Sequence, residues 1–183
     1  MTVHPSLSNS FLTVAVKPRG AELCSVRSAA GVEYLWQADP AVWARHAPIL
    51  FPIVGMLAGD RYTHDGKSYE MKQHGFARDL EFERVEETPQ SLCFRLLPSP
   101  AARTQYPFDF VFCVTYRLEG NRLAIEYQVK NSGPGVLPFS VGVHPGFSLA
   151  WGKDDRIEDY VLEFEQKETA DPRLLGQDHL LSA

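Results

Sequence analysis

The sequence feature that most constrains the fold is a period-two recurrence of large apolar side chains across residues 110–129. They occupy every second position on both sides of Gly120-Asn121: Phe110, Phe112, Val114, Tyr116 and Leu118 before it, and Leu123, Ile125, Tyr127 and Val129 after it. A period of two is typical of a strand with one buried face, and Gly followed by Asn fits a two-residue hairpin loop. The segment therefore predicts a long antiparallel hairpin.

Weaker forms of the same pattern predict strands along most of the chain. We expect them at residues 11–16, 21–26, 33–37, 92–96, 136–143 and 160–165, with Phe82 in a further strand and a hairpin over residues 62–69 that turns at Asp65-Gly66. The apolar run at residues 49–55 is interrupted by Pro52, which favours an edge strand or a bulged strand.

One short helix is expected at residues 41–47. Asp39 can cap its start, and Pro40 suits the first helical position because the N–H that proline lacks has no partner there. Residues 98–107 are polar and contain prolines, which predicts a loop. About a dozen strands with one short helix are typical of an all-β sandwich. No repeat or boundary divides residues 1–183, so we expect one domain.

Composition narrows the possible functions. The 183 residues carry 18 basic and 23 acidic side chains, a net charge of −5, with no basic stripe, which argues against nucleic-acid binding. No run approaches the roughly 20 apolar residues of a membrane helix, and no signal peptide is visible. Cys24, Cys93 and Cys113 are far apart in apolar runs, so we expect free thiols in a reducing, cytoplasmic compartment and no zinc site.

Two histidines lie in loops of similar composition at the ends of predicted strands. His74 precedes Gly75-Phe76, and His144 precedes Pro145-Gly146-Phe147. Histidine exchanges protons near neutral pH, and binding loops on a rigid sheet have this appearance. Either histidine alone is more readily explained by a structural hydrogen bond to the backbone. The two together indicate one pocket, and the aromatic side chains beside them can form its wall.

Other side chains near these histidines allow two interpretations. Arg78 presents a planar fork of donors that can hold a sugar hydroxyl or a phosphate, or it can form a surface ion pair with Asp79 or Glu81. His46 is expected to be exposed on the short helix. The tryptophans can stack on a sugar face or pack in the core: Trp36, Trp43 and Trp151.

Five segments between about residue 10 and residue 165 occur in a characteristic order. They are Gly20-Ala21-Glu22-Leu23, Glu33-Tyr34-Leu35-Trp36-Gln37 with Trp43, Pro48-Ile49-Leu50-Phe51-Pro52-Ile53-Val54-Gly55, His74-Gly75-Phe76-Ala77-Arg78-Asp79 and Val143-His144-Pro145-Gly146-Phe147. In this order they resemble the aldose 1-epimerase (galactose mutarotase-like) superfamily, and more closely its LacX-like branch. The resemblance implies an antiparallel β super-sandwich that interconverts the α and β anomers of a free aldose without a cofactor or a metal.

The resemblance also implies roles for individual residues. His144 matches the general acid that protonates the sugar ring oxygen, and His74 matches a second histidine that contacts the sugar near that oxygen. Both roles need a group that can protonate or hydrogen-bond an oxygen near pH 7. Four further side chains are expected to bind the sugar: Arg78, Phe76, Phe147 and Arg61.

The chain departs from the family pattern in two places. Met56 replaces the arginine that usually follows the Phe-Pro-Ile-Val-Gly-like run, and Arg61 or Arg78 is the expected substitute. The family's catalytic base, a glutamate, and a sugar-binding aspartate lie beyond the point that matches Ala183, so the resemblance covers the N-terminal portion of a longer domain. We therefore expect weak or no catalysis, lower by on the order of 10²–10⁴-fold, the usual contribution of general acid–base help.

Three functions are compatible with these observations. The first is a mutarotase for a free hexose. The second is a hexose-6-phosphate mutarotase, because the run His-Gly-Phe-Ala-Arg also resembles that group, with Arg78 on the phosphate. The third is a non-catalytic carbohydrate-binding module. An incomplete sandwich exposes strand edges, so we also expect a homo-oligomer formed through such edges.

Overall fold

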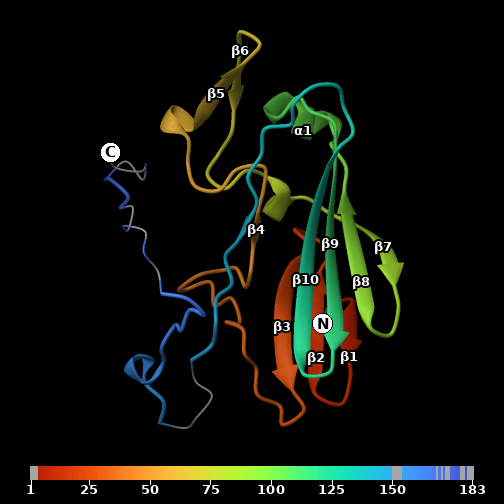
Figure 1. Ribbon diagram of the computed structural model, residues 1–183, viewed down its shortest axis with the longest axis vertical. Coiled ribbons are helices and arrows are strands. Elements are labelled where there is room, and N and C mark those ends of the chain that lie inside the picture. Colours follow the sequence, from red (N-terminus) through yellow and green to blue (C-terminus); the bar gives the residue numbers. More distant parts are fainter. Residues whose placement is uncertain are drawn as a thin grey trace.

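Antiparallel strands make up most of the structure (Figure 1). The computed structural model describes residues 4–149, 154–167, 169, 171, 174–177 and 180. The strands are β1 (Ser6–Ser8), β2 (Leu12–Lys17), β3 (Glu22–Ser28), β4 (Ile49–Leu50), β5 (Arg61–His64), β6 (Lys67–Glu70), β7 (Glu83–Glu87), β8 (Ser91–Leu96), β9 (Phe110–Glu119), β10 (Arg122–Asn131) and β11 (Gly142–Val143). The helical elements are α1 (Pro100–Gln105) and the single-turn 3₁₀ helices η1 (Ala58–Asp60), η2 (Ala77–Asp79) and η3 (Ile157–Asp159).

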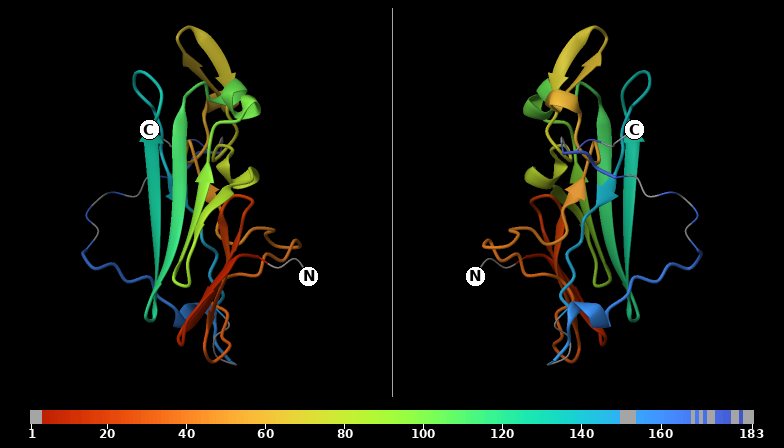
Figure 2. Two further views of the ribbon diagram at one scale, coloured as in Figure 1. Left: turned by 90° about the vertical axis from the view of Figure 1, so that its right-hand side faces the viewer. Right: turned by 90° about the vertical axis from the view of Figure 1, so that its left-hand side faces the viewer.

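Two sheets face each other and enclose the core (Figure 1, Figure 2). The larger has the strand order β10-β9-β8-β7, and the smaller has the order β1-β2-β3. Val14 and Val16 of β2 and Phe112 and Val114 of β9 belong to the same buried cluster. The strands β4 and β11 form a small separate pair, as do β5 and β6. The all-β sandwich predicted from the sequence is thus confirmed.

The long hairpin is confirmed in position and register. The strands β9 and β10 pair without a break from Leu118 opposite Leu123 to Phe110 opposite Asn131. Alternate residues of β9 are buried, as the period-two pattern requires. The strands predicted at residues 11–16 and 21–26 correspond to the antiparallel pair β2 and β3, and the hairpin predicted over residues 62–69 corresponds to β5 and β6.

Phe51 lies at the centre of the core. Its side chain is fully buried and its ring stacks on that of Phe112 of β9, with a centroid separation of 4.6 Å. Four more aromatic rings surround it: Phe76, Tyr106, Phe110 and Phe139. Aromatic pairs of this kind add to the free energy gained from burial alone. The segment that carries Phe51, directly after β4, is therefore held firmly against the larger sheet.

The prediction of a helix at residues 41–47 is wrong. One turn closes through hydrogen bonds to the Asp39 carbonyl. The last two amides of the segment then donate to the buried carboxylate of Glu22 instead of to carbonyls four residues earlier. Because a tertiary partner satisfies these amides, the helix does not continue. His46, expected to be exposed, is only 8% exposed.

The segment predicted as a loop at residues 98–107 contains α1. Ser99 caps this helix, since its Oγ accepts a hydrogen bond from the Ala102 amide at 3.1 Å. Ala102 and Tyr106 are buried in the core cluster. A cap followed by proline therefore makes a helix here but not at Asp39, because here the apolar face has a core to pack against.

Three other predicted strands differ from the structure. Of residues 136–143, only the pair that forms β11 is a strand, and Pro138 has no N–H to offer a ladder. Residues 160–165 are not a strand, and Val161 and Leu162 are largely exposed. In the described part of the chain no neighbouring strand lies beside them to complete a ladder. Residues 33–37 form only isolated bridges.

The state of the cysteines and the length of the helices can be compared with the expectations from composition. Cys24, Cys93 and Cys113 are free, as expected, and Cys24 is fully buried. Across the described residues, no helix is both long enough and apolar enough to cross a membrane.

Replacing Phe51 by alanine tests the central role of its ring. Removing a large buried aromatic side chain leaves a cavity, so we expect Phe51→Ala to lower the free energy of unfolding by about 3–5 kcal/mol. Urea denaturation followed by circular dichroism measures this change. The matched control is Val42→Ala at an exposed position, where we expect a change within about 0.5 kcal/mol. Equal effects at the two positions would contradict this description of the core.

Candidate functional site

The two histidine loops lie on opposite sides of one segment, residues 48–55, which contains β4. On one side, β11 pairs with β4, and the His144 amide donates to the Pro48 carbonyl at 3.1 Å. On the other side, Gly75 forms a bridge with Phe51, and the His74 amide donates to the Gly55 carbonyl at 2.7 Å. The segment thus brings together two loops that are far apart in the sequence (Figure 1).

His74 is held with one ring nitrogen engaged. Its Nδ1 accepts a hydrogen bond from the Gly55 amide at 3.0 Å, so in the neutral ring the proton resides on Nε2. Burial, followed by the charges of Arg78 and His144, lowers the pKa of His74. Near pH 7 the ring is therefore neutral and presents an Nε2–H donor. The backbone of His74 has a φ of +66°, a conformation that is uncommon outside glycine and often found at functional sites.

The residue after His74 must be glycine for steric reasons. A Cβ at Gly75 would lie 2.3 Å from the Phe51 carbonyl oxygen and 2.7 Å from Cδ of Pro52. The close approach lets the amides of Phe76 and Ala77 both donate to that carbonyl at 3.1 Å. The glycine thereby anchors the His74 loop directly to the core strand.

His144 is exposed and its imidazole is available to a ligand. The ring packs against that of Trp43, with a centroid separation of 5.1 Å and an interplanar angle of 53°. Within the described residues the His144 side chain makes no hydrogen bond or ion pair, so both ring nitrogens can act on a bound molecule. His144 also lies near enough for its charge to affect the pKa of His74.

Arg78 lies on η2 beside the histidines and is partly buried. Its Nη2 donates to the Gln73 carbonyl at 2.8 Å, and its Nε lies 3.8 Å from the Asp79 carboxylate. Asp79 has a closer partner in Arg45, at 3.0 Å. Burial and the charge of Arg45 lower the pKa of Arg78, while Asp79 opposes this shift. The predicted ion pair with Asp79 is therefore long; among the described residues only Nη2 makes a hydrogen bond, while Nε is buried.

A cavity of about 480 Å³ adjoins Arg78 and Trp43. Four cationic side chains and one carboxylate line it, together with Trp43 and Ala44: Lys17, Arg19, Arg45, Arg78 and Glu22. Sequence reasoning singled out only Arg78 among the four cations. Lys17 and Arg19 lie at the end of β2 and in the turn after it, whereas Arg45 comes from a distant loop.

The two phenylalanines predicted to contact the sugar, Phe76 and Phe147, lie in different surroundings. Phe76 is 7% exposed and packs on Phe51 and Tyr106, so its side chain belongs to the core rather than to a pocket wall. Phe147 is 58% exposed and lines an apolar hollow of about 460 Å³ with Phe11 and other residues.

Arg61 and the tryptophans also have definite positions. Arg61 begins β5, is exposed, and pairs across the hairpin with Glu70. Among the residues that the structure describes, no hydrogen bond or ion pair joins Arg61 to either histidine. Trp36 donates from Nε1 to the Trp43 carbonyl at 2.8 Å, which is a structural role. Trp151 lies outside the described residues.

No cluster of three metal-ligating side chains occurs among the residues that the structure describes. The groups present at the site are the two imidazoles, the Trp43 ring and the neighbouring cations.

Replacing Gly75 by alanine tests the anchoring of the His74 loop. The matched control is Gly66→Ala, because Gly66 has a similar φ of +72° but no atom within 4 Å of the place where a Cβ would lie. We expect Gly66→Ala to lower the free energy of unfolding by about 1–2 kcal/mol, the cost of the left-handed backbone for a residue with a Cβ. Gly75→Ala should cost clearly more, because its methyl group also meets the Phe51 backbone. Denaturant titration measures both values, and equal losses would disprove the clash.

Comparisons with known proteins show the family of the chain. A sequence profile described as aldose 1-epimerase matches residues 5–173. The chain is 36% identical to the plasmid-encoded protein LacX of Lactococcus lactis subsp. lactis over 175 residues, which cover 92% of this chain and 58% of LacX. It is 30% identical to the galactose mutarotase of Mus musculus over 118 residues, 59% of this chain and 33% of the mouse protein.

A solved structure shares the fold. The galactose mutarotase related enzyme from Lactobacillus acidophilus superposes with a TM-score of 0.83 at 42% identity, covering 86% of this chain and 53% of that one. The chain thus spans little more than half the length of LacX and of this enzyme. The match of the profile to most of the chain confirms the resemblance seen in its motifs, and the chain belongs to the aldose 1-epimerase family.

Proposed function

We propose that this chain is a sugar mutarotase that interconverts the α and β anomers of a free hexose. The observation that carries the proposal is the pair of imidazoles on either side of residues 48–55. His74 presents a neutral Nε2–H, and His144 has both ring nitrogens available beside the face of Trp43. An indole face next to a proton donor is a suitable support for a sugar ring.

The proposed reaction moves two protons. A base removes the proton of the anomeric hydroxyl, the bond between the anomeric carbon and the ring oxygen breaks, and the ring oxygen takes a proton from His144. The aldehyde group then rotates about the bond between C1 and C2. The reverse proton transfers close the ring on the other face. His74 donates a hydrogen bond to the ring oxygen and stabilises the charge that develops there.

The base is the one component that we do not assign. Among the described residues no carboxylate contacts the ring of His74 or His144. Without a positioned base, water must take the anomeric proton. We therefore expect exchange faster than in solution but lower by on the order of 10²–10⁴-fold than with a complete acid–base pair.

Replacing His144 tests the proposal. Saturation transfer between the anomeric protons of glucose or galactose, followed by NMR, measures anomer exchange directly. We expect His144→Ala to return exchange to the rate of the sugar alone, because the proton donor is gone. The control is His64→Ala, since His64 lies on β5 and packs on Phe108. Exchange at the solution rate with the unaltered chain, together with retained sugar binding, would favour a non-catalytic carbohydrate-binding module.

A second candidate is a hexose-6-phosphate mutarotase, and the cationic cavity favours it. Arg78 borders both this cavity and the histidine pair, and Trp43 lines the cavity while touching His144. A sugar seated on Trp43 would place a negatively charged substituent within reach of several cations. Guanidinium groups suit phosphate because their donors form a planar fork.

Binding measurements distinguish the two substrate classes. We expect Arg78→Ala to weaken hexose-6-phosphate binding by about 10–100-fold, the usual effect of losing a hydrogen bond to a charged group, while hexose binding changes little. Isothermal titration calorimetry gives both affinities. Arg84→Ala is the control, because Arg84 pairs with Glu87 on β7. If hexose and hexose phosphate lose affinity equally, the free hexose is the better assignment.

A further inference from the structure

Glu22, the first residue of β3, carries a buried carboxylate that the proposed chemistry does not use. It is only 7% exposed. Burying a carboxylate is unfavourable unless hydrogen bonds and opposite charge compensate for the lost water. The partners of this group therefore indicate what it holds in place.

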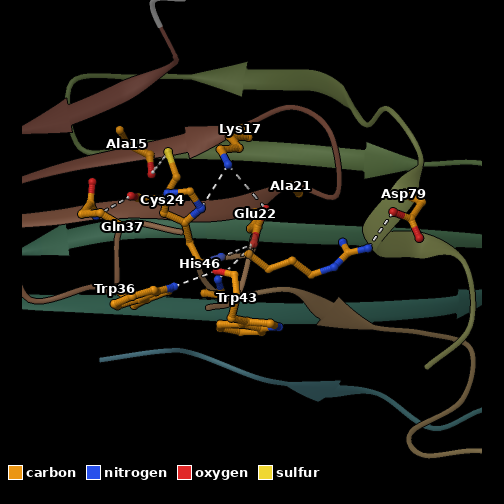
Figure 3. A network of polar contacts seen from close by, with 12 residues as sticks. Ala15, Lys17, Ala21, Glu22, Cys24, Trp36, Gln37, Trp43, His46 and Asp79 are labelled. Carbon is orange, nitrogen blue, oxygen red and sulfur yellow. Dashed lines mark hydrogen bonds and ion pairs between the residues drawn. The ribbon is translucent and has the colours of Figure 1, made fainter. Parts of the chain in front are cut away.

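Those partners are two backbone amides and one ammonium group (Figure 3). One oxygen of Glu22 accepts hydrogen bonds from the amides of His46 at 2.8 Å and Ala47 at 3.1 Å. The other oxygen lies 3.8 Å from Nζ of Lys17. The two amides belong to the loop at residues 43–48, and Lys17 is the last residue of β2. The carboxylate therefore ties this loop to the end of the smaller sheet.

Lys17 also fixes the side chain of His46. Its Nζ lies 3.0 Å from Nδ1 of His46, and because an ammonium group can only donate, that nitrogen must accept. Burial and the charge of Lys17 both lower the pKa of His46, which keeps the ring neutral and able to accept. The loop is thus held through both its backbone and a side chain.

The segment that carries His144 is hydrogen-bonded to this same loop. The Gly146 amide donates to the His46 carbonyl at 2.8 Å, and the His144 amide donates to the Pro48 carbonyl at 3.1 Å. A Cβ at Gly146 would lie 3.0 Å from the Trp43 ring, so the two segments are in close contact. The position of the His144 ring against Trp43 therefore depends on where the loop lies.

The loop needs an external tether because its own sequence favours another conformation. Asp39 and Pro40 are typical of a helix start, and residues 41–47 have helical composition. The two amides that Glu22 binds are those that a continued helix would pair with its own carbonyls. Glu22 competes with that alternative, which would move the carbonyls that receive Gly146 and His144.

We propose that Glu22 is a positioning residue for His144: its carboxylate holds the loop at residues 43–48, and the loop places the imidazole against Trp43. The catalytic part of this statement rests on the proposed function, in which His144 is the proton donor. Glu22 does not contact the sugar and takes no part in proton transfer.

Three substitutions separate positioning from simple stability. Glu22→Gln keeps an oxygen that accepts both amides. Glu22→Met keeps the length of the side chain but has no such acceptor. Leu92→Ala is the matched control, because Leu92 is fully buried in β8 and its loss also destabilises the chain without touching the loop.

The first readout is the proton NMR shift of the His144 ring, assigned by its absence in His144→Ala. The Trp43 ring current displaces this signal, so the shift reports the contact between the two rings and needs no activity. We expect Glu22→Met to move the signal toward its value in the unfolded chain, with Glu22→Gln and Leu92→Ala close to the unaltered protein. The second readout is anomer exchange, where we expect Glu22→Met to lower kcat by about 10–100-fold, the usual effect of misplacing a reacting group, with KM little changed and with recovery in Glu22→Gln.

Each outcome decides the matter. An unchanged His144 signal in folded Glu22→Met overturns the proposal, as does an equal displacement in Leu92→Ala. If Glu22→Met does not fold, Glu22→Asp replaces it, because a shorter side chain with the same charge must draw the loop inward and partly displace the signal; no displacement overturns the proposal. A displaced signal together with anomer exchange that does not depend on His144 supports the positioning role and disproves the proposed function.

Discussion

The structure depends on residue Phe51, because its side chain and its carbonyl serve the core and the site at once. The ring is fully buried among aromatic side chains, of which Phe110 and Phe112 belong to the larger sheet. The carbonyl receives the amides of Phe76 and Ala77, which secures the loop of His74. On its other side the same segment, residues 48–55, pairs with the strand that leads to His144. The cohesion of the core therefore also determines where the two imidazoles lie.

The titratable groups around the site lie in two different environments, one at His74 and one at the Glu22 carboxylate. Toward His74, burial and Arg78 favour a neutral imidazole, with its proton on Nε2 because Nδ1 accepts from the Gly55 amide. Toward the loop at residues 43–48, a buried carboxylate is compensated by backbone amides and by Lys17. A carboxylate at such a position is stable only because all of its partners are present together. This requirement couples the end of the smaller sheet to the segment that carries His144.

Sequence patterns predicted the hairpins well and the short helices poorly. The hairpin at residues 110–129 was predictable because alternate residues of each strand face the core, buried in β9 and partly buried in β10, which leaves a period of two in the sequence. The helix start at Asp39 and Pro40 and the one at Ser99 look alike, yet only the second continues. The difference is tertiary: Glu22 takes the amides of the first segment, whereas the second has a buried face against the core. Likewise, the burial of Phe76 follows from the rings around it and not from its motif.

The sequence by itself determined the antiparallel fold, the family, and the two histidines with the glycines that follow them. These features depend on the alternation of apolar residues, on turn residues and on the order of motifs, all of which can be read along the chain. Only the tertiary structure decided which side chains share a site. Lys17, Arg19, Arg45 and Arg78 line one cavity although they come from three distant parts of the chain. Glu22 meets residues more than twenty positions away along the chain. Such encounters depend on how two sheets and their loops pack in space, and no local pattern encodes that arrangement.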